Sequence, residues 1–157
     1  MERFAKPGVA GIIEKSEAGV DYILIQERCK ADAPAETGLL EIPAGKIREF
    51  ENIYDCLRRE VREETGLTVT VIVGEDDASY VRANGYKVLM YQPFASSQNL
   101  EGEYSIMVQA FLCRVAGELL SFSDEARNMR WIKLDELSGL LADKQETFYP
   151  MHVGALR

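Results

Sequence analysis

A group of carboxylates near the middle of the chain is the feature with the clearest chemical meaning. Glu60, Glu63 and Glu64 lie in the stretch REVREET (59–65), which reads as the end of a helix closed by Gly66. Carboxylates at positions i, i+3 and i+4 share one side of a helix and repel one another unless a cation compensates them. Oxygen ligands suit Mg2+ and Mn2+, so the spacing indicates a divalent-metal site.

The helix expected over about 52–65 places these acids on its inward side. At about 100° per residue, the three acids fall on the same side as the apolar Cys56, Leu57 and Val61. The opposite, solvent-facing arc is assigned to Asp55, Arg58, Arg59, Arg62 and Thr65. A solvated acidic face is the ordinary alternative, and the angular arrangement argues against it because buried acids need a cation or a proton.

Composition fits an ordinary globular protein. The chain has 157 residues, 46% hydrophobic and 28% charged, which favours one domain over 1–157. A net charge of −8 argues against partners such as duplex nucleic acid or an anionic membrane. The three cysteines are widely spaced, and no apolar run is long enough for a membrane span, so we expect a cytoplasmic location.

Short β-branched runs surround the expected helix. Segments 8–15 and 21–28 flank a turn and predict a hairpin, and 29–38 reads as an exposed loop. Further strands are expected at 39–42, 67–74, 86–94 and 104–115, with a short strand running into a helix over 129–142. The polar segment 95–103 is predicted to be a surface loop, with a substrate-covering role as the alternative. The pattern predicts an α/β fold, with helices on the faces of a mixed sheet.

The wider spacing around the acids resembles the Nudix box. Glycine, five residues, glutamate, seven residues and Arg-Glu-hydrophobic-x-Glu-Glu-x-Gly-hydrophobic are carried here by Gly45, Glu51, Arg59, Glu60, Val61, Glu63, Glu64, Gly66 and Leu67. On this motif the chain is identified as a member of the Nudix hydrolase family. The resemblance implies an α/β/α sandwich with a loop-helix-loop box, a Mg2+ or Mn2+ cofactor and hydrolysis of a nucleoside diphosphate linked to another group. A homodimer is a family-level expectation.

The resemblance also implies roles for the residues of the box. Glu60, Glu63 and Glu64 would bind the divalent ions, and Gly45 would let the backbone approach metal and phosphate. Glu51 would assist the metals or form an ion pair with Arg59. Arg59 itself would either orient Glu51 and its loop or contact the substrate.

Residues outside the box match the family less closely. Glu125 precedes Trp131 by six residues, similar to a loop position where some members carry a catalytic glutamate, so it joins Glu63, Glu64 and Arg59 as a catalytic candidate. Its rivals as general base are Asp124, Glu101 and Glu103. Arg28 resembles a phosphate-contacting arginine of some relatives, the alternative being an exposed arginine. His152, the single histidine, is interpreted as structural or exposed because nothing pairs with it.

The lead-in LLEIPAGKI (39–47) resembles the branch of the family that hydrolyses ADP-ribose and other ADP-sugars. That branch usually has a longer N-terminal segment, a proline about 16 residues after Leu67 and a glycine where Phe50 stands. Two alternatives stay open, a (deoxy)nucleoside triphosphate pyrophosphohydrolase and a non-catalytic nucleotide-binding module. An aromatic stack on the base is expected, without a choice among Phe4, Tyr22, Tyr80, Tyr86, Tyr91 and Phe94.

Overall fold

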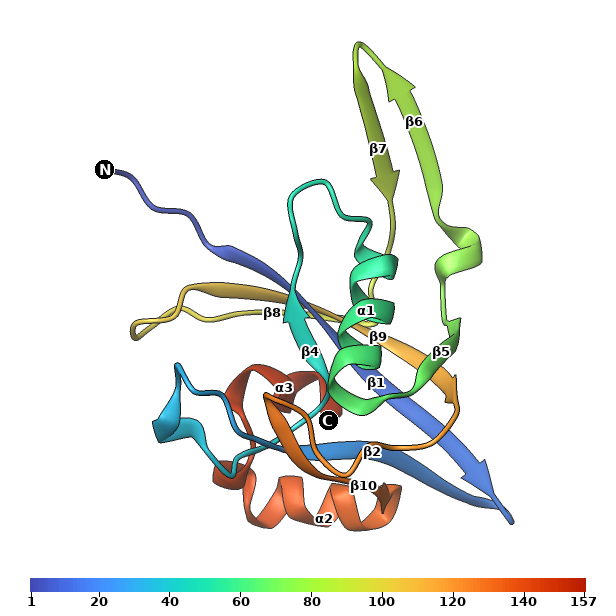
Figure 1. The fold of residues 1–157 in the computed structure, drawn as a ribbon, viewed down its shortest axis with the longest axis vertical. Helices are drawn as coiled ribbons and strands as arrows, with labels where there is room; N and C mark the ends of the chain where they lie inside the picture. Colours follow the sequence, from blue (N-terminus) through green and yellow to red (C-terminus); the bar gives the residue numbers. More distant parts are fainter.

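The computed structural model describes residues 1–157 and is built around a mixed β-sheet (Figure 1). Strands β10, β2, β1, β9 and β5 follow one another across the sheet, while β3, β4 and β8 pair with β2, β1 and β9. Strands β1 and β9 run parallel, and the other pairs are antiparallel. The bounds are β1 Lys6–Glu17, β2 Val20–Arg28, β3 Leu40–Glu41, β4 Ala44–Lys46, β5 Thr68–Ile72, β8 Ala95–Gln98, β9 Ile106–Ala116 and β10 Ala126–Lys133.

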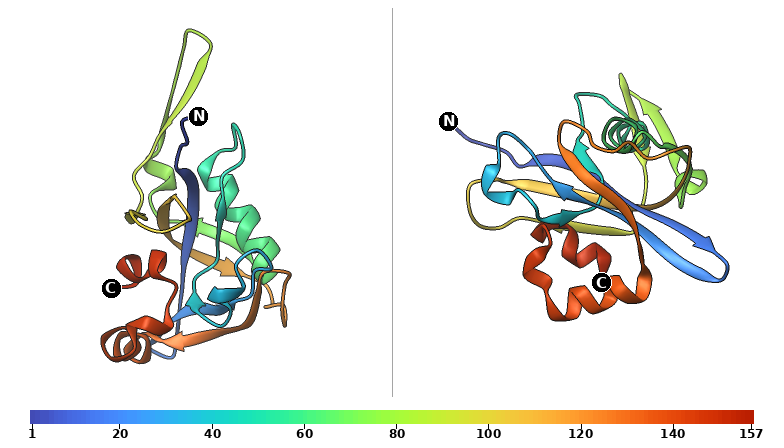
Figure 2. Two further views of the ribbon diagram at one scale, coloured as in Figure 1. Left: turned by 90° about the vertical axis from the view of Figure 1, so that its left-hand side faces the viewer. Right: turned by 60° about the horizontal axis from the view of Figure 1, so that its bottom comes forward.

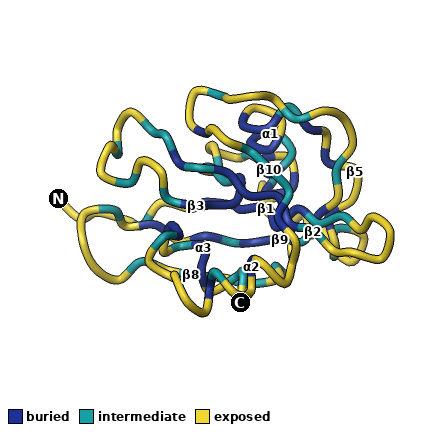
Figure 3. The backbone as a smooth tube through the Cα atoms, turned by 90° about the horizontal axis from the view of Figure 1, so that it is seen from below, coloured by how far each residue is buried: buried dark blue, intermediate teal, exposed yellow.

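Helices cover both faces of this sheet (Figure 2). Helix α1 (Ile53–Thr65) contacts β1, β4 and β5, while α2 (Leu134–Asp143) and α3 (Pro150–Leu156) contact the sheet through β2, β10, β1 and β8. Side chains alternate along β1, so that Val9 and Ile13 join the core under α1, while Ala10 and Ile12 join the other core. The predicted mixed sheet between two helical layers is confirmed, and Figure 3 shows the buried backbone concentrated in the strands between them.

Helix α1 has its ends where the sequence predicts them. The side chain of Asn52 caps the first turn by accepting a hydrogen bond from the Tyr54 backbone N–H at 2.9 Å. Gly66 ends the helix with φ of 80°, a left-handed conformation that glycine adopts without strain. Thr65 is a correction, because it is buried rather than solvent-facing. Its hydroxyl donates to the Val61 carbonyl at 2.6 Å and accepts from the Leu67 N–H at 3.1 Å, which satisfies it inside the core.

The hairpin expected over 8–28 is present as β1 and β2, with Glu17 paired to Val20. The loop over 29–38 contains only a short 3-10 turn, Pro34–Glu36. None of the helices has the length and apolar character needed to cross a membrane.

The segment 95–103 is partly a strand rather than a loop throughout. Residues Ala95–Gln98 form β8, which pairs antiparallel with β9 from Ala95↔Ala110 to Gln98↔Met107. Its two serines are consecutive and so point to opposite faces of the strand: the Ser96 hydroxyl donates to Gln109 of β9 at 2.6 Å, and the Ser97 hydroxyl donates to the Met151 carbonyl at 3.1 Å. The polar side chains of residues 95–98 therefore belong to a strand at the edge of the sheet and not to a loop.

The strand expected over 86–94 is shorter and belongs to a different sheet. Strand β7 (Tyr86–Met90) pairs only with β6 (Ser79–Ala83), which the sequence analysis missed. Asn84 and Gly85 connect them with φ of 51° and 84°, the conformation that favours Asn-Gly in two-residue hairpin turns. The short helix α3 was also missed.

Candidate active site

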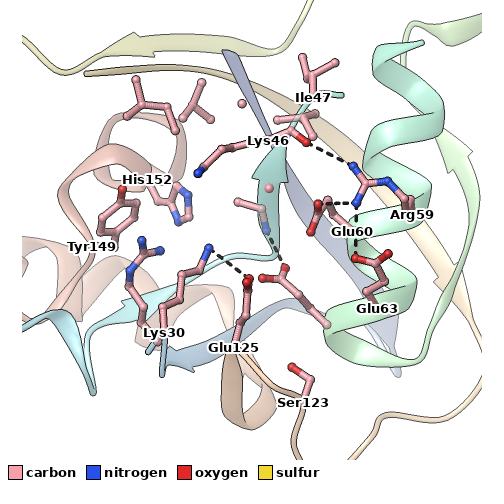
Figure 4. Close-up of a pocket in the computed structure, with 18 of the residues that line it drawn as sticks. Lys30, Lys46, Ile47, Arg59, Glu60, Glu63, Ser123, Glu125, Tyr149 and His152 are labelled. Carbon is pink, nitrogen blue, oxygen red and sulfur yellow. Dashed lines mark hydrogen bonds and ion pairs between the residues drawn. The ribbon is translucent and has the colours of Figure 1, made fainter. Parts of the chain in front are cut away.

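A cleft of about 610 Å3 opens between α1 and β4 on one side and the loops after β2 and β9 on the other. Its walls include the N-terminal part of β1 and residues of α3. The titratable side chains that line it are Arg28, Lys30, Lys46, Arg48, Arg59, Glu60, Glu63, Glu64, Tyr104, Asp124, Glu125, Tyr149 and His152. Acids from α1 occupy one side, Lys30 extends from the opposite side, and the Lys46 side chain runs from β4 across the cleft toward His152 (Figure 4).

The acids of α1 are held in unequal environments. Glu60 and Glu64 are buried, with 8% and 3% exposure, whereas Glu63 is exposed. Glu64 Oε2 accepts a hydrogen bond from the Ala44 N–H at 2.9 Å, but its Oε1 is buried and has no partner. Burial raises the pKa of Glu64 well above its ordinary value and also raises the pKa of Glu60. The predicted inward orientation holds for Glu60 and Glu64 but not for Glu63.

Arg59 reaches across to these carboxylates, which corrects its assignment to the opposite arc. Its Nη1 lies 2.7 Å from Glu60 Oε1 and 3.4 Å from Glu63 Oε2. A helical wheel places Arg59 only about 40° from Glu63, and the long side chain covers that angle. Arg59 also donates through Nη2 to the Lys46 carbonyl at 3.2 Å, which ties α1 to β4.

Glu51 forms the ion pair that was one of its two expected roles. Arg59 donates to it twice, from Nε at 2.8 Å and from Nη2 at 2.9 Å, and the Arg48 N–H adds a third hydrogen bond. These bonds lower the pKa of Glu51 to about 2, with Arg59 as the largest cause. Glu51 does not line the cleft, so a direct contact with metal remains a prediction.

Gly45 lies against Glu60 with no room for a side chain. A β-carbon on this glycine would fall 1.9 Å from Glu60 Cδ and 2.3 Å from its Oε1. The absence of a side chain therefore leaves the Glu60 carboxylate its place beside the β4 backbone.

The residues present fit a divalent cation by their chemistry, although no three acidic, imidazole or thiol groups converge on one point. In Figure 4 the Arg59 guanidinium lies between the carboxylates of Glu60 and Glu63. A cation would need those carboxylates to turn away from Arg59. The partnerless Oε1 of Glu64, together with the raised pKa of that buried carboxyl, identifies a group that forms no ion pair within the cleft.

Glu125 lines the same cleft and is partnered by a lysine. Its Oε2 lies 3.3 Å from Lys30 Nζ, and its side chain is 50% exposed. Of its rivals, Asp124 lines the cleft, whereas Glu101 and Glu103 do not. The structure thus places Glu125 and Asp124 across from α1 and removes the other two acids from the site.

Arg28 lines the cleft but is not the exposed arginine considered as its alternative. It is 6% exposed and forms ion pairs with Glu41 at 2.8 Å and Glu36 at 2.6 Å. Its guanidinium carbon lies 3.9 Å from the centre of the Tyr149 ring. Contact with a phosphate remains a prediction for Arg28, because its donors already serve two carboxylates.

His152 is buried, with 1% exposure, so the exposed alternative is wrong. The expectation that nothing pairs with it is also wrong, because its Nδ1 accepts a hydrogen bond from the Ile42 N–H at 3.2 Å. Burial, with smaller contributions from Arg28 and Lys30, lowers the pKa of His152 to about 3. The neutral ring therefore carries its proton on Nε2.

Several cleft residues were not singled out from the sequence, and four of them matter for charge and for stacking. Lys30 and Lys46 supply positive charge, and Tyr104 and Tyr149 are the aromatic residues that line the cleft. None of the six aromatic candidates does so. Lys46 lies in the segment LLEIPAGKI that precedes the box, so its place near the site could have been predicted. Tyr104 and Tyr149 lie far from the box in the sequence, and no motif around them indicates a role in the site.

Comparison with known proteins identifies the class. The family model described as NUDIX domain matches residues 5–152. The chain belongs to this family, as the spacing of the box predicts, which places it among the Nudix hydrolases.

Individual relatives within the family share little sequence identity with this chain. The NAD-capped RNA hydrolase NudC of Pseudomonas aeruginosa is 27% identical over 107 residues, which cover 68% of this chain and 31% of NudC. The chain thus matches about a third of that relative's length.

Solved structures share the fold. The solution structure of the E. coli ORF135 protein is 24% identical, with a TM-score of 0.64 and coverage of 96% of this chain and 85% of that one. The NUDIX domain of Shewanella oneidensis NrtR, determined with ADP ribose, is 12% identical, with a TM-score of 0.64 and coverage of 88% and 79%.

Proposed function

We propose that this protein hydrolyses the pyrophosphate bond of a nucleoside diphosphate linked to another group, with ADP-ribose or another ADP-sugar as substrate and Mg2+ or Mn2+ as cofactor. The products are a nucleoside monophosphate and a phosphorylated second group. The substrate rests on the resemblance of LLEIPAGKI to the ADP-sugar branch. The NrtR domain determined with ADP ribose shares the fold, which is compatible with this ligand.

The observation that supports the reaction type is the presence of both acidic and basic side chains in one cleft. Glu60, Glu63 and Glu64 line it from α1, while Lys30 lines it from the loop after β2 and Lys46 from β4. Each phosphoryl unit of a pyrophosphate carries negative charge on its non-bridging oxygens, so cations around it stabilise binding and the transition state. The lysines supply positive charge directly, and the acids would contribute through a bound divalent ion.

Glu60, Glu63 and Glu64 are the residues that would hold the metal. When bound, the metal lowers the pKa of a water molecule and offsets charge that develops on the phosphate oxygens. The Ala44 N–H fixes Glu64 through its Oε2, which leaves Oε1 directed away from that hydrogen bond. Arg59 holds Glu51 and the Lys46 carbonyl and so positions the loop against α1.

Glu125 is the proposed general base. Its half-exposed carboxylate lines the cleft beside Lys30, where it can accept a proton from water. Asp124, its neighbour in the cleft, is the competing candidate. Lys30 pairs with Glu125 in the free protein. When substrate is bound, the same ammonium group can instead offset the negative charge of a phosphate.

The relation to NudC favours a second candidate substrate, a dinucleotide of the NAD type. Such a molecule also contains a pyrophosphate between two groups, and the same cleft chemistry applies to it. The partial coverage of NudC leaves its RNA substrate as a property of that protein.

Product identification tests both candidates. Purified protein with Mg2+ or Mn2+ is incubated with ADP-ribose, other ADP-sugars, NAD+ and the common (deoxy)nucleoside triphosphates. We expect AMP and ribose 5-phosphate from ADP-ribose as the best substrate. AMP and nicotinamide mononucleotide as the main products indicate the second candidate. Pyrophosphate release from triphosphates alone contradicts both, and no turnover of any substrate contradicts the proposed hydrolysis.

A further inference from the structure

Buried polar atoms without a hydrogen-bond partner gather at the cleft. Five buried side chains carry such an atom, and three of these side chains, those of Glu64, Ser123 and His152, line the cleft. Glu64 belongs to the proposed metal site, and a serine hydroxyl can rotate toward another acceptor. His152 has neither explanation, because its partnerless atom is the ring nitrogen Nε2. Buried N–H groups in folded proteins nearly always have an acceptor, which makes a bound molecule the candidate for the missing partner.

The imidazole of His152 is fixed in both position and tautomer. Its Nδ1 accepts a hydrogen bond from the Ile42 N–H at 3.2 Å, which leaves the proton on Nε2. The ring also packs edge-on against Tyr149, with ring centres 5.0 Å apart and ring planes at 83°. The Tyr149 N–H in turn donates to the Leu40 carbonyl at 2.8 Å, which ties the start of α3 to β3. The direction of the Nε2–H bond is therefore set by the fold.

His152 keeps this donor over the usual range of pH. Its pKa is lowered to about 3, chiefly by burial, so the ring is neutral at neutral pH. A neutral imidazole of this tautomer donates one hydrogen bond and adds no charge to the cleft. Its contribution to binding should therefore not change with pH above that pKa.

The position of His152 in the cleft decides which part of a substrate it meets. Figure 4 places His152 and Tyr149 on one side of the cleft and Glu60 and Glu63 on the other. The cleft has a volume of about 610 Å3, which is in the range that holds a ligand larger than a diphosphate. A diphosphate held through a cation at the acids of α1 therefore leaves His152 beside the group attached to it, away from the reacting phosphorus.

We propose that His152 is a specificity-determining residue, whose Nε2–H donates a hydrogen bond to a neutral oxygen or nitrogen acceptor on a group attached to the pyrophosphate. This inference rests on the proposed function. In ADP-ribose the acceptor belongs either to adenosine or to the second group, the ribose, since both carry acceptors of this kind. A molecule without the acceptor binds poorly, because it leaves the donor buried and unpaired.

Nε2 is buried in the free protein, so a side chain must move before a ligand reaches it. Lys46 is that side chain, because it runs across the cleft toward His152 (Figure 4). Its ammonium group lies 5.5 Å from the centre of the Tyr104 ring and forms no ion pair. A substrate phosphate attracts this ammonium group, and its departure opens the space in front of the imidazole.

Nuclear magnetic resonance can observe this contact directly, because His152 is the single histidine of the chain. Untagged protein with isotope-labelled histidine gives the ring-nitrogen signals of this imidazole alone. We expect the Nε2–H form in the free protein from about pH 5 to pH 8. Mg2+ with the α,β-methylene analogue of ADP-ribose, whose bridging carbon prevents hydrolysis, should shift the Nε2–H signal. The Nδ1 signal is the internal reference, because its partner Ile42 stays the same.

The α,β-methylene analogue of ADP distinguishes the two sources of the acceptor, because it contains adenosine but no second group. Equal shifts with both analogues assign the acceptor to adenosine. A shift with the ADP-ribose analogue alone assigns it to the second group. Either result supports the proposal. Binding of both analogues by calorimetry, with no shift of the Nε2–H signal, overturns it.

Two substitutions separate the roles of the two ring nitrogens. His152→Asn keeps an oxygen near the place of Nδ1, where it can accept from the Ile42 N–H, but has no donor at the place of Nε2. His152→Gln has the reverse properties. His152→Asn should raise KM about threefold to tenfold, the effect of one hydrogen bond, with kcat unchanged. His152→Gln should bind more tightly than His152→Asn, and the opposite order would show that only the bond to Ile42 matters.

Failure of this inference can be told apart from failure of the proposed function. Turnover of ADP-ribose with an unshifted His152 signal overturns the inference alone. A shifted signal without turnover supports the contact and contradicts the proposed hydrolysis. Absence of binding by either analogue contradicts both.

Discussion

Gly45 leaves the space beside it to the Glu60 side chain, since a β-carbon added to the glycine would lie 1.9 Å from Cδ of the glutamate. The pair joins β4 to α1, the two elements that form one wall of the cleft. Because the obstructing atoms belong to the end of a side chain, the clash can be relieved by moving the Glu60 carboxylate rather than the backbone.

Gly45→Ala is therefore expected to impair activity more than stability. The displaced Glu60 carboxylate loses its position for a cation, and kcat/KM should fall by about tenfold to a hundredfold, the range for a misplaced catalytic group. Gly139→Ala in α2 is the matched control, because no atom lies within 4 Å of its added β-carbon. Steady-state kinetics and thermal unfolding of both variants check this. Equal kinetics for Gly45→Ala and wild type would show that Glu60 has no role at its observed position.

Arg28 should be needed for stability whether or not it contacts a phosphate. Arg28→Met leaves Glu41 buried, at 1% exposure, without its ion-pair partner. Loss of one partner of a buried pair costs about 3–5 kcal/mol, which urea unfolding can measure. Adding Glu41→Gln should restore much of the loss, because the glutamine carries no charge. If the restored double variant keeps the wild-type KM, Arg28 acts through Glu41 and not on the substrate.

Mg2+ should stabilise the fold in a pH-dependent way. Burial raises the pKa of Glu64 well above 4.5. A carboxyl whose pKa is raised by folding favours the fold below its unfolded pKa, and that contribution is lost as pH rises through the folded pKa. A bound cation offsets the cost of the ionised form. The gain in Tm on adding Mg2+ should therefore be larger at about pH 8 than at about pH 5.

Glu64→Gln provides the comparison for that pH dependence. Its amide oxygen can still accept from the Ala44 N–H, which Glu64 does at 2.9 Å, but it carries no charge to titrate. Differential scanning fluorimetry at both pH values should show a smaller and less pH-dependent effect of Mg2+ in this variant. An undiminished, pH-dependent gain in Glu64→Gln would assign the effect to another site.

Hydrolysis should depend on Glu63 and Glu64, which line the cleft, and not on an acidic residue of α1 outside the cleft. Glu63→Gln and Glu64→Gln are each expected to lower kcat by about a hundredfold or more, as expected when metal-assisted charge stabilisation is lost. Asp55→Asn lies on the same helix, with its side chain 70% exposed, and should retain wild-type kcat. Initial rates on the best substrate decide between these outcomes.

The box was readable from the sequence because its chemistry lies in residue types at fixed local spacing. Asn52 and Gly66 bound α1 for the same reason, since caps act on the nearest turn. Arg59 and Thr65 were misplaced because a helical wheel records the direction in which each side chain leaves the helix. It does not record the reach of an arginine or the loop that buries the last turn, where the Leu120 N–H donates to the Thr65 carbonyl.

The rest of the cleft depends on pairing between distant segments. Parallel pairing of β1 with β9 places Lys6 opposite Ile106. A contact between residues so far apart in the sequence cannot be predicted from a local pattern of residue types. Tyr104 and Tyr149 reach the cleft through this arrangement and through α3. Strand β8 was hidden by its polar residues, and β6 by the short turn at Asn84, although Asn-Gly between β-branched runs is a recognised hairpin signal.

Anomalous diffraction from crystals grown with Mn2+ and a non-hydrolysable nucleotide diphosphate analogue tests the central claim most directly. We predict a manganese peak about 2.2 Å from carboxylate oxygens of Glu60 and Glu64, with the Arg59 guanidinium withdrawn from Glu60. A manganese peak elsewhere in the molecule, with Arg59 still bound to Glu60 and Glu63, would contradict it.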